Sequence, residues 1–156
     1  MLCIESRREK WYHLGNRRNW NEAGELHEKN SGSFGSIDGT PTTAFAVSLD
    51  GKRLDVSRRV LFTHLTDVQA DGSVFSDSTR TLLYDWGKGG CVACDGKVEV
   101  RLSIAKPERC TVYALGTDGN RKCRIKSRIE DGSLLFTANV RQPFGACFHY
   151  EIESSD

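Results

Sequence analysis

Two of the six cysteines have the spacing of a metal site. Cys91 and Cys94 are separated by two residues, with Gly90 directly before the pair and Gly96 shortly after it. This spacing is half of a zinc knuckle, and a closed tetrahedral site needs two further ligands. The remaining candidates, none of which repeats the two-residue spacing, are Cys110, Cys123, Cys147 and His149. We therefore expect no metal cofactor, and a zinc-binding interaction module built on Cys91 and Cys94 is the alternative hypothesis.

The residue pattern gives no support to nucleophilic or acid–base catalysis. The histidines are scattered at His13, His27, His64 and His149. No Gly-x-Ser-x-Gly elbow occurs, and no cysteine has the local signature of a nucleophile. The glycines in 87–90 lack the spacing of a phosphate-binding loop. We expect no catalytic residues, so this chain alone is not an enzyme.

Trp86 is the best candidate for a binding residue. It lies between Asp85 and Lys88 in a glycine-rich stretch over 85–90. An exposed indole can stack on the face of a sugar ring while nearby polar groups bind the hydroxyls. We therefore predict a carbohydrate-binding site formed by Trp86, Asp85 and Lys88. The alternative is a structural tryptophan that is buried and closes one end of the fold.

The composition excludes several classes of partner. In 156 residues, 22 Lys and Arg balance 21 Asp and Glu, and the net charge of +1 supplies no long-range field for a nucleic-acid backbone. No stretch reaches the ~18 consecutive apolar residues of a membrane span. In the first ten residues the apolar side chains precede the charges, the reverse of a signal peptide. We expect no nucleic acid, no membrane, a cytoplasmic location by default and reduced thiols.

Aspartate–glycine pairs mark the elements that must position these residues. Six of the fifteen glycines follow an aspartate. Asp-Gly is the preferred pair for a two-residue type I′ hairpin turn, because both positions need a positive φ. The pairs begin at Asp38, Asp50, Asp71, Asp95, Asp118 and Asp131. Six such signals predict a mostly β protein.

The segments between the pairs alternate as strands do. The clearest is 97–104, in which every second residue is apolar and one face is expected to be buried. Those core residues are Val98, Val100, Leu102 and Ile104. Residues 42–49 alternate as well, with Thr43, Phe45, Val47 and Leu49 on one face, and a hairpin through Asp50-Gly51 to 52–54 is predicted. Further strands are predicted over 59–65, 79–84, 111–115, 123–129, 134–138 and 147–152.

Short strands with recurrent turns indicate an all-β fold, an antiparallel β-sandwich of jelly-roll or immunoglobulin-like type over residues 34–156. Residues 1–33 differ, because they are highly charged, have little periodicity and end in the flexible sequence Asn-Ser-Gly-Ser. We expect them to form an irregular N-terminal arm. Asn19 and Glu22 match a capping box for one short helix over 19–26.

The order of the motifs resembles the β-sandwich accessory domain that lies C-terminal to the catalytic barrel in large modular bacterial glycoside hydrolases. The matching motifs are AVSLDGKRL at 46–54, RVL at 59–61, DSTRT at 77–81, DWGKG at 85–89, VYAL at 112–115, DGNR at 118–121, IEDG at 129–132 and YEI at 150–152. The resemblance covers about residues 34–156. Gly90 stands where the family usually has a proline.

This resemblance implies a non-catalytic role. In the family the catalytic glutamates lie on the barrel, and a (β/α)₈ barrel needs roughly 250 residues, more than this chain has. The resemblance implies that the chain binds carbohydrate, or packs on a protein partner such as a catalytic barrel domain. The enzymes it resembles are often exported.

Overall fold

The protein is all-β, as the sequence predicts. The computed structural model describes residues 4–6, 12–14, 32–36, 42–77 and 80–155. Within these ranges there is no α-helix, and the helical turns are two 3₁₀ segments, η1 (Leu54–Val56) and η2 (Pro107–Arg109). The described part of the chain accordingly has no helix with the length and apolar character to cross a membrane.

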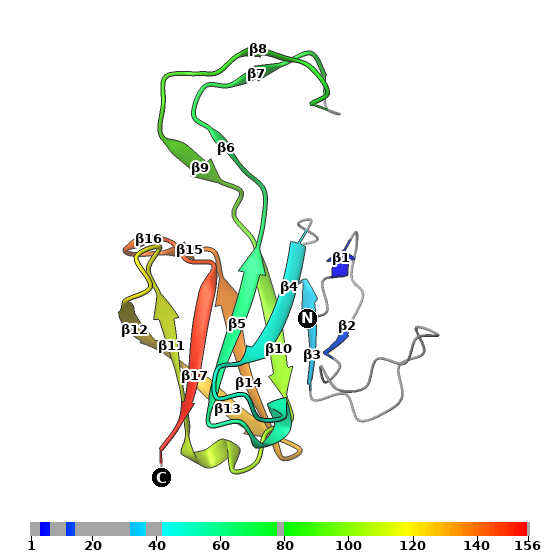
Figure 1. The fold of residues 1–156 in the computed structure, drawn as a ribbon, viewed down its shortest axis with the longest axis vertical. Helices are drawn as coiled ribbons and strands as arrows, with labels where there is room; N and C mark the ends of the chain where they lie inside the picture. The colour runs from blue at the N-terminus through cyan, green and yellow to red at the C-terminus, as the bar shows by residue number, and fades with distance from the viewer. Residues whose placement is uncertain (1–3, 7–11, 15–31, 37–41, 78–79, 156) are drawn as a thin grey trace.

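Two antiparallel sheets form the body of the molecule (Figure 1). The six-stranded sheet contains, in spatial order, β1 (Ile4–Ser6), β4 (Thr42–Ser48), β5 (Arg59–Leu65), β17 (His149–Ser154), β11 (Cys110–Leu115) and β12 (Arg121–Ile125). The five-stranded sheet contains β13 (Ser127–Glu130), β14 (Ser133–Asn139), β10 (Lys97–Leu102), β3 (Gly32–Ser36) and β2 (Tyr12–Leu14). A small hairpin of β15 (Arg141–Gln142) and β16 (Gly145–Ala146) precedes β17.

Three strands lie at or before the expected boundary of the N-terminal arm. β1 pairs with β4, and β2 pairs with β3. β3 spans the predicted boundary at residue 33 and pairs with β10, so Gly32 and Ser33 are not the flexible stretch that the sequence predicts. Pairing with a central strand outweighs the weak β-propensity of glycine and serine here. The short helix expected over 19–26 lies outside the described residues.

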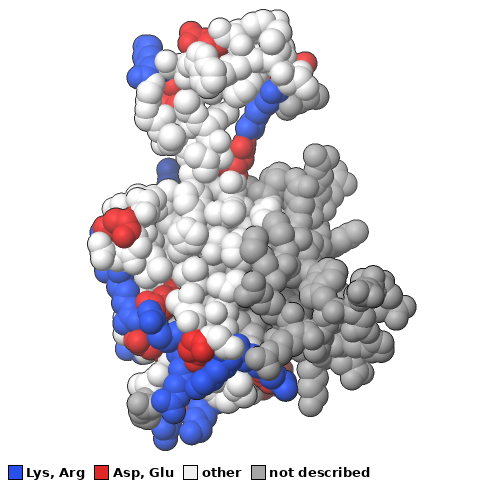
Figure 2. Space-filling model, in the orientation of Figure 1, with Lys and Arg blue, Asp and Glu red and all other residues white. Residues whose placement is uncertain are grey.

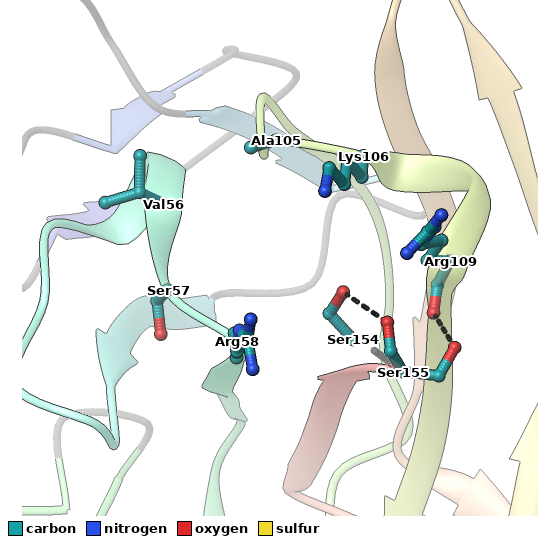
Figure 3. Close-up of a pocket in the computed structure, with 8 residues that line it drawn as sticks. All are labelled: Val56, Ser57, Arg58, Ala105, Lys106, Arg109, Ser154 and Ser155. Carbon is teal, nitrogen blue, oxygen red and sulfur yellow. Dashed lines mark hydrogen bonds between the residues drawn. The ribbon is translucent and has the colours of Figure 1, made fainter.

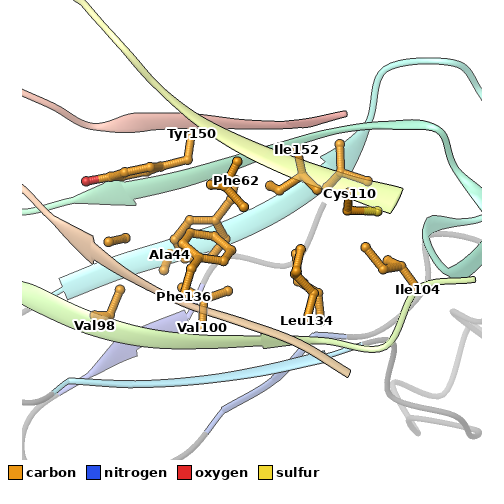
Figure 4. Close-up of a cluster of buried hydrophobic side chains, with 14 of the residues drawn as sticks. Ala44, Phe62, Val98, Val100, Ile104, Cys110, Leu134, Phe136, Tyr150 and Ile152 are labelled. Carbon is orange, nitrogen blue, oxygen red and sulfur yellow. The ribbon is translucent and has the colours of Figure 1, made fainter. Parts of the chain in front are cut away.

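One hydrophobic core joins the two sheets (Figure 4). Its centre is a cluster of three aromatic rings, in which Phe62 meets Phe136 edge to face with centroids 5.8 Å apart. Tyr150 contacts both rings, at centroid distances of 6.5 Å and 5.9 Å. Phe62 and Tyr150 belong to the six-stranded sheet and Phe136 to the five-stranded sheet. The rings therefore pack one sheet against the other.

The strict alternation of 97–104 is confirmed. The four predicted core residues, Val98, Val100, Leu102 and Ile104, are all buried. In β4 the core face is instead formed by small residues such as Ala44, and the larger Phe45 and Val47 are only half-buried. Alternation therefore locates a buried face only where the other face is clearly polar.

The hairpin expected from 42–49 to 52–54 is wrong in its second strand. β4 pairs with β5, and the connection between them contains η1. The cause is Asp50, whose carboxylate accepts hydrogen bonds from Arg58 N at 2.9 Å, Ser57 Oγ at 2.8 Å and Ser48 Oγ at 2.7 Å. These bonds lower the pKa of Asp50 well below its ordinary value and fold the connection around one side chain.

The remaining turn signals have mixed outcomes. Asp131 and Gly132 have φ values of 49° and 70°, so the predicted type I′ geometry occurs between β13 and β14. At Gly119 and Gly72 the glycine alone has a positive φ. The single strand expected over 123–129 is wrong, because the chain leaves the six-stranded sheet after Ile125 and enters the five-stranded sheet at Ser127. Asp38-Gly39 lies outside the described residues.

Tyr150 is a buried phenol that fixes the end of β14. Its hydroxyl donates to Asn139 O at 2.7 Å and accepts from Asn139 N at 2.8 Å. Burial raises the pKa of Tyr150 far above its ordinary value. The hydroxyl is therefore a neutral crosslink between β17 and β14.

We predict that Tyr150→Phe lowers the free energy of unfolding by about 1–3 kcal/mol, the cost of leaving a buried amide without its partner. Urea denaturation measures this difference. Tyr113→Phe is the matched control, because Tyr113 is a half-buried tyrosine of β11. Equal free energies of unfolding for the two variants would contradict this role of the hydroxyl.

Glu151 is a buried carboxylate held by two arginines on the outer face of the six-stranded sheet. Its oxygens accept from Arg121 Nε at 2.7 Å and from Arg59 Nη2 at 2.6 Å. Arg121 also lies over the ring of Tyr113, with its guanidinium carbon 4.4 Å from the centroid. The hydrogen bonds from Arg121 and Arg59 outweigh desolvation and lower the pKa of Glu151. The cluster links β5, β17 and β12.

We predict that Glu151→Gln lowers the free energy of unfolding by about 1–3 kcal/mol near neutral pH. Because the folded-state pKa is depressed, the stabilisation is complete above the ordinary value of 4.5 and is lost as the pH falls through the lowered value. The difference in free energy of unfolding between wild type and Glu151→Gln should therefore become smaller in urea titrations below pH 4.5. The exposed Glu108→Gln is the control. A difference in free energy of unfolding that stays constant with pH would contradict stabilisation by the ionised Glu151 carboxylate.

Candidate functional site

A long β-ribbon projects from the body, and we define it as residues 66–95. It rises from the end of β5, returns to the start of β10 and stands clear of both sheets (Figure 1). β6 (Val68–Ala70) pairs with β9 (Cys91–Ala93), and β7 (Val74–Phe75) pairs with β8 (Leu83–Asp85). Figure 2 shows it as a mostly uncharged projection. The strand predicted over 79–84 is confirmed only in part, as β8.

Exposed apolar side chains concentrate in the ribbon. Of the ten exposed large hydrophobic residues in the described part of the chain, six lie there. They are Val68, Val74, Leu82, Tyr84, Trp86 and Val92. Single exposed apolar residues are ordinary, whereas their concentration on one projecting element is typical of a contact surface. The ribbon is therefore the candidate functional site.

Two aromatic side chains are the most exposed members of this surface. Trp86 is 80% exposed and Tyr84 is 69% exposed, so the alternative of a buried structural tryptophan is wrong. Tyr84 lies in β8 and Trp86 follows directly after its last residue, and we call these two exposed residues the aromatic stripe. The sequence analysis did not single out Tyr84, although its position two residues before Trp86 was a signal that could have found it.

Gly87 holds the stripe in place by a close backbone contact. A Cβ at this position would lie 2.0 Å from Asp71 O, and the residue has a φ of +79°. Lys88 N donates to Asp71 O at 3.0 Å, and Asp71 N donates to Gly90 O at 3.1 Å. The Asp71-Gly72 turn therefore packs directly on the backbone that follows Trp86. Only glycine fits both the conformation and the space.

The two polar residues predicted beside Trp86 have different roles. Asp85 Oδ1 accepts a hydrogen bond from Gly87 N at 2.9 Å, so this carboxylate helps to shape the turn. The Lys88 side chain is exposed, while its backbone N–H bonds to Asp71. Asp85, Trp86 and Lys88 thus lie within one short exposed segment, in which Trp86 has the largest exposed side chain.

Hydrogen bonds connect the two ends of the ribbon where it joins the body. Thr66 Oγ1 donates to Cys94 O at 2.6 Å, and Cys94 N donates to Asp67 O at 2.7 Å. Asp67 also forms an ion pair with Arg80, which lowers the pKa of the Asp67 carboxyl. The Arg80 guanidinium carbon lies 5.8 Å from the centre of the Phe75 ring. The two hydrogen bonds join the ends of the ribbon to each other, and the ion pair connects Asp67 at its base to Arg80.

The cysteines show no assembled metal site among the described residues. Cys91 and Cys94 are exposed on the ribbon, and no group of three potential ligands occurs in the described part of the chain. Cys110 and Cys147 are buried in the body, where desolvation raises the pKa of each thiol. A raised pKa disfavours the thiolate that a metal or a nucleophilic role requires.

The described histidine side chains belong to the body rather than to the ribbon. His64 is fully buried and its Nε2 lies 3.1 Å from Thr42 Oγ1. His149 Nδ1 lies 3.1 Å from Thr63 Oγ1, and burial lowers the pKa of this imidazole. Each ring is hydrogen-bonded to a threonine of the six-stranded sheet.

Comparisons with protein-family models, with curated proteins and with solved structures give no match to this chain.

We predict that Gly87→Ala disrupts the ribbon far more than Gly89→Ala. Both glycines have a positive φ, so both alanine variants cost about 1–2 kcal/mol of backbone strain. Only at Gly87 does the new Cβ also clash, since a Cβ at Gly89 meets no atom within 4 Å. Hydrogen exchange of the Asp71 and Lys88 amides should be about tenfold or more faster in Gly87→Ala than in Gly89→Ala. Equal exchange would refute the close contact.

Proposed function

We propose that this chain is a non-catalytic β-sandwich module that binds carbohydrate through the aromatic stripe of the ribbon. The observation that carries the proposal is the exposure of Tyr84 and Trp86 close together in sequence on a projecting element. Asp85 and Lys88 supply polar groups next to the indole. No catalytic residue is assigned, and the module acts by holding its ligand.

The physical basis is the stacking of sugar rings on exposed aromatic faces. Tyr84 and Trp86 are two residues apart in the chain and both are exposed, so they offer neighbouring aromatic surfaces to one polysaccharide chain. Aromatic side chains provide large contact area at a low cost in conformational entropy. The contact between Gly87 and Asp71 supports the turn beside Trp86, which lowers the entropy lost on binding.

The architecture and the motif order support the same proposal. Two antiparallel sheets share one core, which is the arrangement expected of a β-sandwich. We infer that the module is similar to the accessory domain that follows the catalytic barrel in modular bacterial glycoside hydrolases. In that setting it would bind carbohydrate next to an enzyme rather than cleave it. The DWGKG motif of that resemblance is the segment that carries Trp86.

A second candidate function is packing on a protein partner such as a catalytic barrel domain. Val68, Val74 and Val92 are exposed on the ribbon, and aliphatic side chains contribute to protein contacts rather than to sugar stacking. The two candidates differ in the residues they require. Carbohydrate binding depends on Tyr84 and Trp86, whereas protein packing also depends on the valines.

Affinity electrophoresis in gels that contain xylan, mannan, β-glucan or pectin tests the proposal. We predict that at least one polysaccharide retards the wild-type chain, and that Trp86→Ala weakens this binding by about tenfold, with a smaller loss for Tyr84→Ala. Lys88→Ala should have a lesser effect, because its exposed charge is hydrated.

Val92→Ser is the matched control, since it alters an exposed ribbon residue outside the aromatic stripe. Val92→Ser should leave the retardation unchanged. If no polysaccharide retards the wild-type chain, or if Trp86→Ala binds as well as wild type, carbohydrate binding by the stripe is wrong. Protein packing is then the function that the ribbon supports.

A further inference from the structure

Two cysteines from different elements face one part of the core. Cys123 belongs to β12 and pairs with Ala114 of β11, whose partner on its other side is Tyr150 of β17. Ala114 and Tyr150 are buried, and the Cys123 side chain packs against the core that contains them. Cys147, which precedes β17, is a fully buried member of the same core. Both thiols are free in the structure.

Hydrogen bonds place the Cys147 sulfur beside the end of β11. Its thiol donates to His149 O at 3.4 Å. The sulfur is also hydrogen-bonded to the backbone of Leu115, the residue that follows Ala114. Cys147 and Cys123 therefore both reach the core side of Ala114. Because Ala114 has only a methyl group, no large side chain of β11 stands between the two sulfur atoms.

The electrostatics of Cys147 also indicate that the two sulfur atoms are close together. Burial is the main cause of the raised pKa of Cys147, and the charge of Cys123 adds to it. Coulombic repulsion falls with distance, so this contribution requires Cys123 to be a near neighbour of Cys147. The two residues lie far apart in sequence and on different elements, as the ends of a cross-linking disulfide do.

The other described cysteines are poorly placed to form a disulfide. Cys110 begins β11, four residues before Ala114 and roughly 13 Å away along the strand. It directly follows Arg109, which Figure 3 shows at that end of the body. Cys91 and Cys94 are three residues apart in extended chain, a span of about 10 Å. The Cα atoms of a disulfide lie within about 7 Å of each other.

We propose that Cys123 and Cys147 form a disulfide across the core when the chain folds in the presence of a disulfide oxidant such as glutathione disulfide. One cysteine thiolate attacks glutathione disulfide, whose S–S bond breaks, and one glutathione is released. The second cysteine then attacks the sulfur of the mixed disulfide and releases the other glutathione. The two cysteines lose two electrons and two protons, and glutathione disulfide gains them as two thiols.

The bond joins the edge strand of the six-stranded sheet to the segment that leads into β17. The chain between the two cysteines contains β13 and β14 of the five-stranded sheet, so the closed loop passes through both sheets. A disulfide stabilises the native state mainly by restricting the unfolded chain. The burial of Cys147 also protects the bond, because a reductant must reach a sulfur atom. The pair shares no residue with the ribbon, so the proposal is independent of carbohydrate binding.

Peptide mapping of the refolded full chain tests the proposal. The chain is unfolded and reduced, refolded in a mixture of glutathione and glutathione disulfide, denatured with N-ethylmaleimide and digested with chymotrypsin without reduction. We expect one dominant pair of linked peptides, which contains Cys123 and Cys147, and N-ethylmaleimide on the remaining four of the six cysteines. After refolding with a thiol reductant alone, all six should carry the label.

Thermal melting measures the effect of the bond on stability. The oxidised wild-type chain should melt about 5–15 °C above the reduced chain. Cys123→Ala should lose the linked peptides and melt at the same temperature after either treatment. Cys110→Ala is the matched control, because it removes another buried thiol of the core and should keep both the link and the shift. The wild-type comparison needs no substitution, so it decides the question even if a variant fails to fold.

Three results would overturn the proposal. The first is the absence of a Cys123–Cys147 link after oxidative refolding, or a preference for links between other cysteines. The second is an oxidised wild-type chain that melts no higher than the reduced chain, because a bond that distorts the core does not belong to the native fold. The third is an equal redox shift of the melting temperature in Cys123→Ala and Cys110→Ala.

Discussion

The structure depends on the packing of the two sheets through one apolar core. Phe62 and Tyr150 come from the six-stranded sheet and Phe136 from the five-stranded sheet, and their rings meet in its centre. The ribbon leaves the body at the end of β5 and returns at the start of β10, one strand from each sheet. The core therefore fixes both ends of the ribbon, and loosening the sheets would move the aromatic stripe.

The ribbon extends from this body and exposes apolar side chains to solvent. A purely structural element would not need this exposure. Exposed apolar side chains gain nothing from burial in the free protein, yet most of those in the described chain lie here. Backbone contacts offset part of that cost, above all where Gly87 meets Asp71. A projecting, internally braced and apolar element has the features of a contact surface. On these features we propose a binding role for the ribbon.

The sequence indicated the fold where local pattern and tertiary environment agree. The alternation over β10 predicted its buried face, since its outer residues are polar, and Asp131-Gly132 predicted its turn. The connection after β4 could not be predicted, because it depends on several hydrogen bonds that converge on Asp50. The sequence could give the exposure of Trp86 only as one of two alternatives, since a large aromatic residue is buried in most contexts.

The accessibility of Trp86 in the free protein tests the central claim most directly. In a chain with Trp11→Phe and Trp20→Phe, Trp86 is the sole indole, and acrylamide quenching reports its contact with solvent. We predict quenching close to that of a free tryptophan analogue, and protection when a retained polysaccharide is added. A blue-shifted, poorly quenched emission in the absence of ligand would contradict a ribbon that presents Trp86 to its partner.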